Sequence, residues 1–537
     1  MNRHAWRSAT LGLVMMFALL AVLGVRYTDV ALPHSGGLLA EDVPRGADGF
    51  PLAPRPNVVL IVADDLDEKL MPWMPNTERL IAQQGASFSR YYVEQSTCCT
   101  SRSTILTGQY THNHGVRGNH YPAGGFLRFR DGQESVALPT WLADNDYRSA
   151  MLGKYLNEYP FPGGYNGDAA EKDAMKRYVP PGWQAWVSPV DGEPYRQRET
   201  ILNINGVVDT EPRVQYLDQL LSDRMLAMVR GGDGMDLREG GRFIYYSSYS
   251  PHAPYAAPAR FRDDFTEVEY PRAPNFDEAD VSDKYGLAAV RSRLSALKVQ
   301  KIDAAFRDRI RSVQVLDETV ARLVRTLRRQ GTLENTYIIF TSDNGYNMGE
   351  HRLDIAKYNQ FEETVRVPLL IRGPGIEPGT DISTLTGNVD LAPTIADMSG
   401  TPIPDWVDGL SLLPLLTGEQ TSLPRDSLLL SRGLIPLEKQ ALSGIEEFPE
   451  TQVESARHAR LSDFNALVTK RWKLVQYTNS RHEELYDLRA DPYEMTNLLV
   501  GGWQSLRTMS PTEREVVRDL RRTLLRLVKC QARSCLL

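Results

Sequence analysis

The sequence has few cysteines and no long run of basic residues. Two of its four cysteines, Cys98 and Cys99, are adjacent, and the other two, Cys530 and Cys535, stand at the C-terminus. The C-terminal pair is therefore the candidate for a small disulfide loop, with two free thiols as the alternative. A net charge of −7 without a basic stretch argues against nucleic acid as a partner. No Asn-x-Ser/Thr sequon occurs, which argues against a eukaryotic secretory origin, and no internal repeat is evident.

Long apolar runs are also scarce, and the first of them lies near the N-terminus. Basic side chains there precede an uncharged stretch from Ser8 to Val25, and Arg26 closes it. This pattern predicts that residues 1–26 are a cleaved signal peptide or an uncleaved signal anchor, and both remain open. In either case the rest of the chain is expected to be exported. Residues 27–55, rich in Gly, Pro and Asp, are expected to form a linker.

The 537-residue chain is long enough to bury a large core and too long for one compact domain. Residues 57–63 form a continuous apolar run, which is typical of a strand buried on both faces. Further strands are expected at 148–152, 243–247, 337–341 and 367–371, and helices at 76–84, 138–144 and 306–327. This alternation predicts an α/β fold with a large, mostly parallel sheet between helices.

The pattern changes after about residue 420. Short apolar segments predict an antiparallel sheet, and a basic segment predicts a helix packed on it. These strands are expected at 466–469, 472–477 and 484–488, and the helix at 511–528. We therefore expect a catalytic domain over residues 56–420 and a C-terminal subdomain over residues 421–537.

Carboxylates follow two of the predicted strands. Asp64 and Asp65 come directly after residues 57–63, and Asp343-Asn344 follows residues 337–341. Adjacent acids at one strand end are more often a helix cap or a solvated turn. Two such sets, however, offer oxygen ligands at the carboxyl edge of a sheet, where ligands gather in α/β folds. An oxygen-only site suits Ca²⁺ or Mg²⁺.

The run from Cys98 to Gly108 places a cysteine four residues before Arg102. Arginine stays charged at any working pH and presents a planar fork of donors that suits a tetraoxyanion. The run resembles the sulfatase signature, C-x-P-S-R followed by L-T-G, with Thr100 in place of the usual proline. The resemblance implies that a formylglycine-generating enzyme oxidises Cys98 to formylglycine. Cys99 lies one residue too close to Arg102 for this role.

The resemblance runs from about residue 56 to 500 through five motifs in family order, and it implies an alkaline-phosphatase-like fold. Sulfatases hold one divalent ion, generally Ca²⁺, with an Asp-Asp pair and a later Asp-Asn pair. Matching by position implies that Asp64, Asp65, Asp343 and Asn344 are the ligands. Mg²⁺ remains possible from the chemistry of the donors.

Three further positions match the family pattern. Lys154 stands in G-K-Y-L-N-E-Y, a run similar to that of glucosamine-6-sulfatases and heparan endosulfatases, where the lysine contacts sulfate. Many sulfatases have a histidine two residues later; Leu156 occupies that position, so Asn157 is the expected polar contact. His252 and Lys357 match groups near the leaving-group oxygen. The alternatives are that Lys154 is a solvated surface residue and that His252 is a loop histidine whose hydrogen bonds are all made within the protein.

Together these residues predict an exported hydrolase of sulfate monoesters, most similar to the N-acetylglucosamine-6-sulfatase branch and acting on sulfated sugars. Two alternatives remain open. A phosphonate monoester or phosphodiester hydrolase would use the same metal and nucleophile positions. A sulfated-glycan-binding protein would carry an unmatured Cys98, and Thr100 keeps this reading open because maturation enzymes recognise the Cys-x-Pro-x-Arg segment.

Overall fold

The computed structural model describes residues 55–163, 165–213, 215–285, 292–353, 355–433, 463–478 and 480–536. The predicted signal or anchor segment lies outside the described residues, as does the linker up to residue 54. Within the described ranges, no helix combines the length and the apolar character that a membrane span requires.

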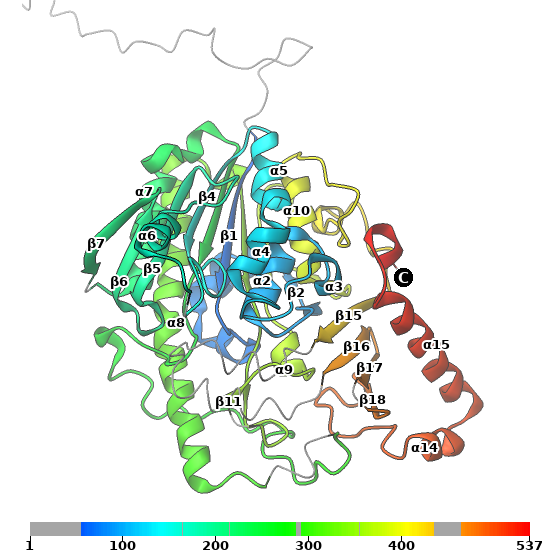
Figure 1. The fold of residues 1–537 in the computed structure, drawn as a ribbon. Coiled ribbons are helices and arrows are strands. Elements are labelled where there is room, and N and C mark those ends of the chain that lie inside the picture. The colour runs from blue at the N-terminus through cyan, green and yellow to red at the C-terminus, as the bar shows by residue number, and fades with distance from the viewer. Residues whose placement is uncertain are drawn as a thin grey trace, which may run out of the picture. The chain divides into compact units, whose positions relative to one another are not determined.

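A ten-stranded sheet runs through the centre of the described chain (Figure 1), in the order β13-β2-β12-β9-β1-β8-β4-β5-β6-β7. The central strands β9, β1, β8, β4 and β5 are mutually parallel, whereas β12 and the outer strands β6 and β7 pair antiparallel. The strands are β1 (Asn57–Ala63), β2 (Ala86–Phe88), β4 (Arg148–Gly153), β5 (Ala185–Glu193), β6 (Arg198–Ile204), β7 (Val207–Arg213), β8 (Arg242–Ser247), β9 (Thr336–Ser342), β12 (Leu369–Arg372) and β13 (Thr380–Ile382). The predicted mostly parallel sheet is confirmed.

The register of the central strands positions the predicted acidic residues. β1 is fully buried, as its continuous apolar sequence predicts. Ala63 at its end pairs with Ser342 of β9, and Val62 pairs with Ser247 of β8. Because the strands are parallel and end together, the residues that follow β1 and β9 emerge side by side at one edge of the sheet.

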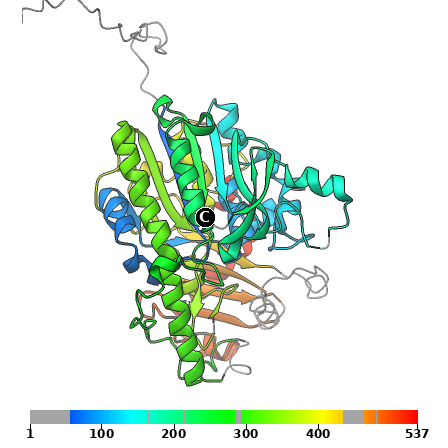
Figure 2. The same ribbon diagram turned by 90° about the vertical axis from the view of Figure 1, so that its left-hand side faces the viewer.

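Helices cover both faces of the sheet (Figures 1 and 2). One face packs against α2 (Cys98–Thr107), α4 (Gly125–Gly132), α5 (Leu138–Asp144) and α10 (Leu391–Met398), and the other against α1 (Pro75–Leu80), α7 (Leu217–Val229) and α8 (Ala296–Gln330). In α8, side chains such as Phe306, Ile310 and Val313 are buried at helical spacing, as the sequence predicts. The predicted helical sandwich is confirmed.

The C-terminal part forms a separate four-stranded antiparallel sheet, in the order β15-β16-β17-β18. Its elements are β15 (Ser427–Arg432), β16 (Phe464–Thr469), β17 (Trp472–Tyr477), β18 (Glu483–Asp487) and α15 (Pro511–Leu527), which packs on it. The predicted small sheet and helix are therefore confirmed, with β15 as an additional strand. One apolar cluster contains side chains of both sheets, and the boundary at residue 420 stays a prediction.

Several elements differ from the expectation. The helix predicted at 76–84 divides into α1 and a 3₁₀ turn, Ala82–Gln84. The meander β5–β7 and helix α7 were not predicted. Register shifts interrupt the pairing of β5 with β6 and of β6 with β7, and bulges break the period-2 pattern by which strands are recognised.

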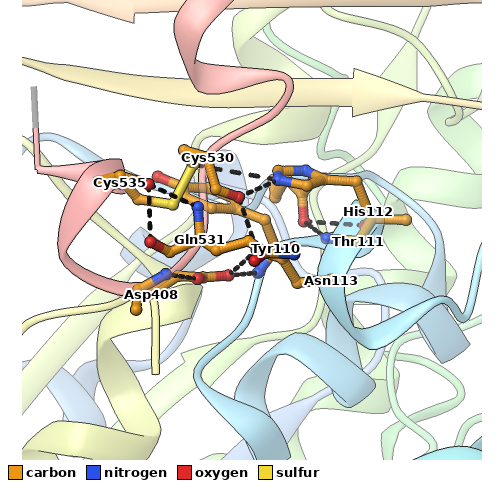
Figure 3. Close-up of a disulfide and its surroundings, with 11 residues drawn as sticks. Tyr110, Thr111, His112, Asn113, Asp408, Cys530, Gln531 and Cys535 are labelled. Atoms are coloured by element: carbon orange, nitrogen blue, oxygen red, sulfur yellow. Dashed lines mark hydrogen bonds between the residues drawn. A yellow bond between two sulfur atoms is a disulfide. The ribbon is translucent and has the colours of Figure 1, made fainter. Parts of the chain in front are cut away.

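Cys530 and Cys535 form the predicted disulfide. Figure 3 shows it against α3 (Thr111–His114), which follows α2 in the chain. Nδ2 of Asn113 donates to the carbonyl of Cys530 at 3.0 Å, and Nε2 of His112 lies 2.8 Å from the same oxygen. Asp408 accepts the backbone N–H of Ala532 at 2.6 Å. The disulfide loop is thus attached by polar contacts to α3 and to the segment that contains Asp408.

Replacing both Cys530 and Cys535 by serine is expected to lower the free energy of unfolding by about 2 kcal/mol, because the closed loop is short and constrains the unfolded chain only modestly. Denaturant titration with and without a reducing agent measures the effect. Reduced wild-type protein should match the double variant. A wild-type unfolding midpoint that does not respond to reduction would contradict the disulfide.

Candidate active site

The structure gathers the predicted residues from distant parts of the chain around Cys98. Its Sγ lies 3.6 Å from Oδ1 of Asp64 and 3.9 Å from Oδ1 of Asp65. Nζ of Lys357 lies 3.0 Å from the same sulfur. All of these side chains are buried. Cys98 therefore stands within a dense cluster of charged groups.

Cys98 opens helix α2, and every residue of this helix is buried. Cys99, by contrast, belongs to the apolar cluster against which this helix packs. Burial raises the pKa of the Cys98 thiol, although Lys154 and Lys357 partly oppose the rise. The unmodified residue is thus a protonated thiol and a weak nucleophile at neutral pH.

Each of the three carboxylates is paired with one cation. Nζ of Lys154 donates to Oδ2 of Asp64 at 2.6 Å, and Nζ of Lys357 donates to Oδ1 of Asp65 at 2.7 Å. Nε of Arg102 donates to Oδ2 of Asp343 at 2.8 Å. The negative and positive charges of the cluster therefore balance.

The pairing controls the protonation of the carboxylates. Burial alone would raise the pKa of Asp64, but the positive charge of Lys154 lowers it below its ordinary value. The pKa of Asp65 is lowered in the same way, against burial, by Lys357. Burial raises the pKa of Asp343 to about 6, although Arg102 lies beside it. Asp64 and Asp65 are consequently ionised at neutral pH.

Arg102 is fixed by several contacts. Its Nη1 donates to the carbonyl of Lys154 at 2.9 Å and to Oγ of Ser247, at the end of β8. Its Nη2 lies 3.8 Å from Oδ1 of Asp64, and among the described residues no acceptor completes a hydrogen bond to it. A rigid, buried guanidinium with a spare donor is suited to bind an anion.

His252 lies at the outer side of the cluster. Its Nδ1 is 2.7 Å from the carbonyl of Ala253, so this nitrogen carries the hydrogen and Nε2 faces the site. Nε2 lies 3.6 Å from Oδ2 of Asp65. The side chain is 12% exposed, compared with 3% for Lys154 and Lys357. Burial lowers the pKa of His252, and the charge of Asp65 opposes this shift.

The acidic residues fit a divalent cation. Ligand atoms of Asp64, Asp65, Cys98 and His252 lie within 4.8 Å of one another. Nδ2 of Asn344 donates to Oδ1 of Asp65 at 2.6 Å, whereas its Oδ1 is buried and no donor in the described part of the chain reaches it. Buried polar atoms normally have a partner, and a hard cation suits carboxylate and amide oxygens.

Comparisons with known proteins agree with this geometry. The sulfatase family pattern matches residues 56–401. N-acetylglucosamine-6-sulfatase of Capra hircus is 33% identical over 465 residues, which cover 83% of this chain and 80% of that protein. The chain belongs to the sulfatase family. It is a sulfuric ester hydrolase, and the predicted resemblance is confirmed.

Two solved structures share the fold of this sulfatase. One is a complex with its substrate D-glucosamine-2-N,6-O-disulfate, with a TM-score of 0.66 at 22% identity, covering 87% of this chain and 97% of the other. The second is the phosphonate monoester hydrolase of Agrobacterium radiobacter, with a TM-score of 0.61 at 21% identity, covering 88% and 96%. The fold is therefore common to enzymes that act on different esters.

Asp218 of α7 holds the loop that carries His252 in this sulfatase. Its carboxylate is fully buried and accepts hydrogen bonds from Oγ of Ser248 at 2.7 Å and Oγ of Ser250 at 2.6 Å. The backbone N–H of Tyr249 donates to it at 3.2 Å. Asp218 could not be predicted from the sequence, because nothing in the pattern of residues around it distinguishes it.

Arg309 of α8 is a second residue that the sequence did not single out. Its guanidinium is fully buried, donates to the backbone carbonyl of Asp65 and pairs with Asp67 at 2.7 Å. It also lies over the ring of Tyr346, 4.8 Å from the ring centroid. Asp65 adopts a positive φ of 65°, and Arg309 connects this strained turn to the loop after β9.

Asn157 is not joined to the cluster by its side chain. Its backbone carbonyl accepts the N–H of Phe126 at 2.8 Å. Its Oδ1 is buried and unpaired among the residues described. Asn157 follows Lys154 by three residues in the chain. Within the described residues, its side chain makes no hydrogen bond to the other predicted site residues. Its expected contact with substrate stays a prediction.

Proposed function

We propose that this sulfatase hydrolyses sulfate monoesters of sulfated sugars such as N-acetylglucosamine-6-sulfate, with Cys98, Arg102, Lys154, His252 and Lys357 as its catalytic residues. The observation that carries the proposal is the buried cluster of two lysines and one arginine around the residue that begins α2. The name of the similar Capra hircus protein supports the sugar substrate.

The charge balance of the cluster supports anion chemistry. Three carboxylates are matched by three cations, so a bound divalent ion would leave the pocket with a net charge of plus two. We propose Ca²⁺, with Mg²⁺ as the alternative, held by Asp64, Asp65, Asp343 and Asn344. Bound by these residues, such an ion would neutralise the charge of the ester's sulfate and polarise its oxygens. The preorganised positive charge then favours the more highly charged transition state.

Formylglycine derived from Cys98 is the proposed nucleophilic group, and an aldehyde at this position supplies a hydrated carbon whose oxygen can attack sulfur. The residues around it have separate tasks. Arg102 orients the sulfate through its free Nη2 donor, and Lys154 and Lys357 stabilise the oxygens that gain charge. Burial of all these groups excludes bulk water and strengthens their electrostatic effect.

We expect His252 to protonate the departing sugar oxygen. Its Nδ1 hydrogen is held by a backbone carbonyl, so Nε2 is the atom that exchanges a proton with substrate. The imidazole lies at the outer, partly exposed side of the cluster, where the ester's organic part must leave. A sugar alkoxide is a poor leaving group and needs this proton in the transition state.

His252→Gln is expected to lower kcat for N-acetylglucosamine-6-sulfate by about 10²–10⁴-fold, because general acid catalysis typically contributes that factor. The loss should be far smaller for 4-nitrophenyl sulfate, whose leaving group departs without a proton. Parallel steady-state kinetics on the two esters measure the difference. Equal losses on both would show that His252 does not act on the leaving group.

Thr100 bears on maturation by the proposed formylglycine-generating enzyme. It lies in the first turn of α2, where the first helical hydrogen bond runs from Ser101 N to Thr97 O at 2.9 Å. A proline at residue 100 would therefore remove no helical hydrogen bond. Oγ1 of Thr100 is buried, and no partner for it lies in the described ranges. The fold does not require threonine at this position.

Thr100→Pro is consequently expected to raise the fraction of Cys98 converted to formylglycine when the maturation enzyme is limiting, without lowering the melting temperature. Peptide mass spectrometry after co-expression measures the converted fraction. Thr100→Ala, which removes the unpaired hydroxyl but does not create the Cys-x-Pro-x-Arg segment, is the control. A lower conversion in the proline variant than in wild type would contradict the expectation.

The fold alone does not choose between sulfate and phosphonate or phosphodiester substrates, since a phosphonate monoester hydrolase shares it. The experiment that tests the proposed function compares kcat/KM on N-acetylglucosamine-6-sulfate, an aryl sulfate and an aryl phosphodiester, with and without Ca²⁺. We expect Ca²⁺-dependent turnover of both sulfates in preference to the phosphodiester. The reverse preference would contradict the proposal.

We also propose that the protein acts outside the cytoplasm, secreted or held by its N-terminal segment. The disulfide between Cys530 and Cys535 supports an oxidising compartment. Cell fractionation followed by thiol labelling tests this. Protein found in the cytosol with both C-terminal cysteines reduced would contradict export.

A further inference from the structure

Tyr195 lies beside the catalytic cluster and belongs to none of the family motifs. It stands in the short turn Pro194–Arg196, between β5 and β6. Nζ of Lys154 lies 5.1 Å from the centroid of its ring, and the ring of His252 lies 4.6 Å away, centroid to centroid. One aromatic ring thus contacts both a proposed sulfate-binding residue and the proposed general acid.

The ring is held in place by its surroundings. It packs edge-to-face on Tyr249 with a centroid distance of 5.3 Å and an interplanar angle of 88°. Tyr249 directly precedes the Ser250-Pro251-His252 segment. Aromatic pairs in this arrangement are favourable and restrict each other's orientation. The position of Tyr195 is therefore fixed relative to His252.

A hydrogen-bond network connects the two loops as well. Nε2 of Gln197, two residues after Tyr195, donates to Oδ2 of Asp218 at 3.1 Å, and the N–H of Asp218 donates to Oε1 of Gln197 at 2.9 Å. The same carboxylate holds Ser248 and Ser250 in the His252 loop. Asp218 thus holds both loops, and the positions of Tyr195 and His252 are fixed before any substrate binds.

The site has a deep layer of buried side chains and an outer layer of partly exposed ones. The side chains of Arg102, Lys154 and Lys357 are at most 3% exposed and form the deep part that takes the anion. His252 and Tyr195 are partly exposed. Because the leaving-group oxygen joins the sulfate to the sugar and is expected beside His252, the sugar ring must lie in the outer layer, next to Tyr195.

We propose that Tyr195 is a substrate-binding residue whose ring contacts the apolar face of the pyranose that carries the sulfate ester. The inference rests on the proposed function and adds the residue that recognises the sugar rather than the sulfate. A sugar ring presents C–H groups that can cover an aromatic surface, while its hydroxyls stay available for hydrogen bonds. The contact with Lys154 keeps a positive charge over the tyrosine ring, as cation–π geometry favours.

The test uses full-length, matured protein and three variants: Tyr195→Leu, Tyr195→Phe and, as a control, Tyr493→Leu, whose side chain is 40% exposed in the C-terminal subdomain. Three quantities are measured for each variant. They are kcat and KM for N-acetylglucosamine-6-sulfate, and the inhibition constant of inorganic sulfate, which probes the deep anion site without a sugar.

Tyr195→Leu is expected to raise KM about tenfold, the effect of one lost aromatic contact, with little change in kcat. The inhibition constant of inorganic sulfate should not change. Tyr195→Phe should behave as wild type because it keeps the ring, and Tyr493→Leu should have no effect.

Two results would overturn the inference. An unchanged KM in Tyr195→Leu would show that the ring does not contact the sugar. A parallel rise in KM and in the inhibition constant of sulfate would show that Tyr195 only supports Lys154. Failure of the proposed function is distinguishable, because wild-type protein would then hydrolyse an aryl sulfate but not the sugar sulfate.

Discussion

Cys98→Ala is expected to abolish turnover, lowering kcat by about 10⁴-fold or more while the fold stays intact. The substitution removes the precursor of the proposed nucleophile, and no other described residue takes its place between Asp64, Asp65 and Lys357. Kinetics on an aryl sulfate measure the loss, and thermal denaturation shows that the variant is folded.

Cys99→Ala is the matched control, since both cysteines are fully buried and lie in the same helical turn. Cys99 packs in the apolar cluster, so its truncation should cost about 1 kcal/mol of stability and leave most of the activity. If the two variants lost activity equally, the assignment of Cys98 as the modified residue would be wrong.

Removal of the proposed divalent cation is the second change with a large expected effect. Chelation should lower activity by about 10³-fold, because the ion is expected to supply several kcal/mol of transition-state stabilisation. Added Ca²⁺ should restore it. Without the ion, the three carboxylates remain paired with Lys154, Lys357 and Arg102, so the protein should stay folded.

Asp64→Asn tests whether the ion is held at this site. The variant should be inactive at all Ca²⁺ concentrations and leave the charge of Lys154 without its carboxylate partner. Asp317→Asn is the control: Asp317 is buried and accepts hydrogen bonds from Asn76 and Thr77, away from the cluster. That variant should be less stable but keep its response to Ca²⁺. Full activity of chelated wild-type protein, with metal loss verified by elemental analysis, would contradict the metal site.

The central strands were predictable because burial on both faces leaves a clear sequence pattern. β1 and β9 each contain a central apolar run and are fully buried, and their boundaries agree with the expectation to within one residue. The meander β5–β7 was not predictable, because its irregular pairing depends on contacts across the sheet edge. The short strand β15 was missed because its partner β16 follows after a long interval in the chain.

The same contrast applies to the site. Asp64 and Asp343 could be placed together from the sequence, since each follows a buried parallel strand. Arg309, Asp218 and Tyr195 could not, because their positions beside the cluster arise from tertiary contacts between distant segments. Arg309 reaches Asp65 across 244 positions of sequence, and nothing local to α8 indicates that contact.

The most direct test is mass spectrometry of the peptide that contains Cys98 and Cys99, from protein produced in its native host. We predict an aldehyde at residue 98 that reacts with a hydrazide reagent, with an unmodified thiol at residue 99. A peptide that carries only unmodified thiols, in protein that nevertheless hydrolyses sulfate esters, would contradict the account.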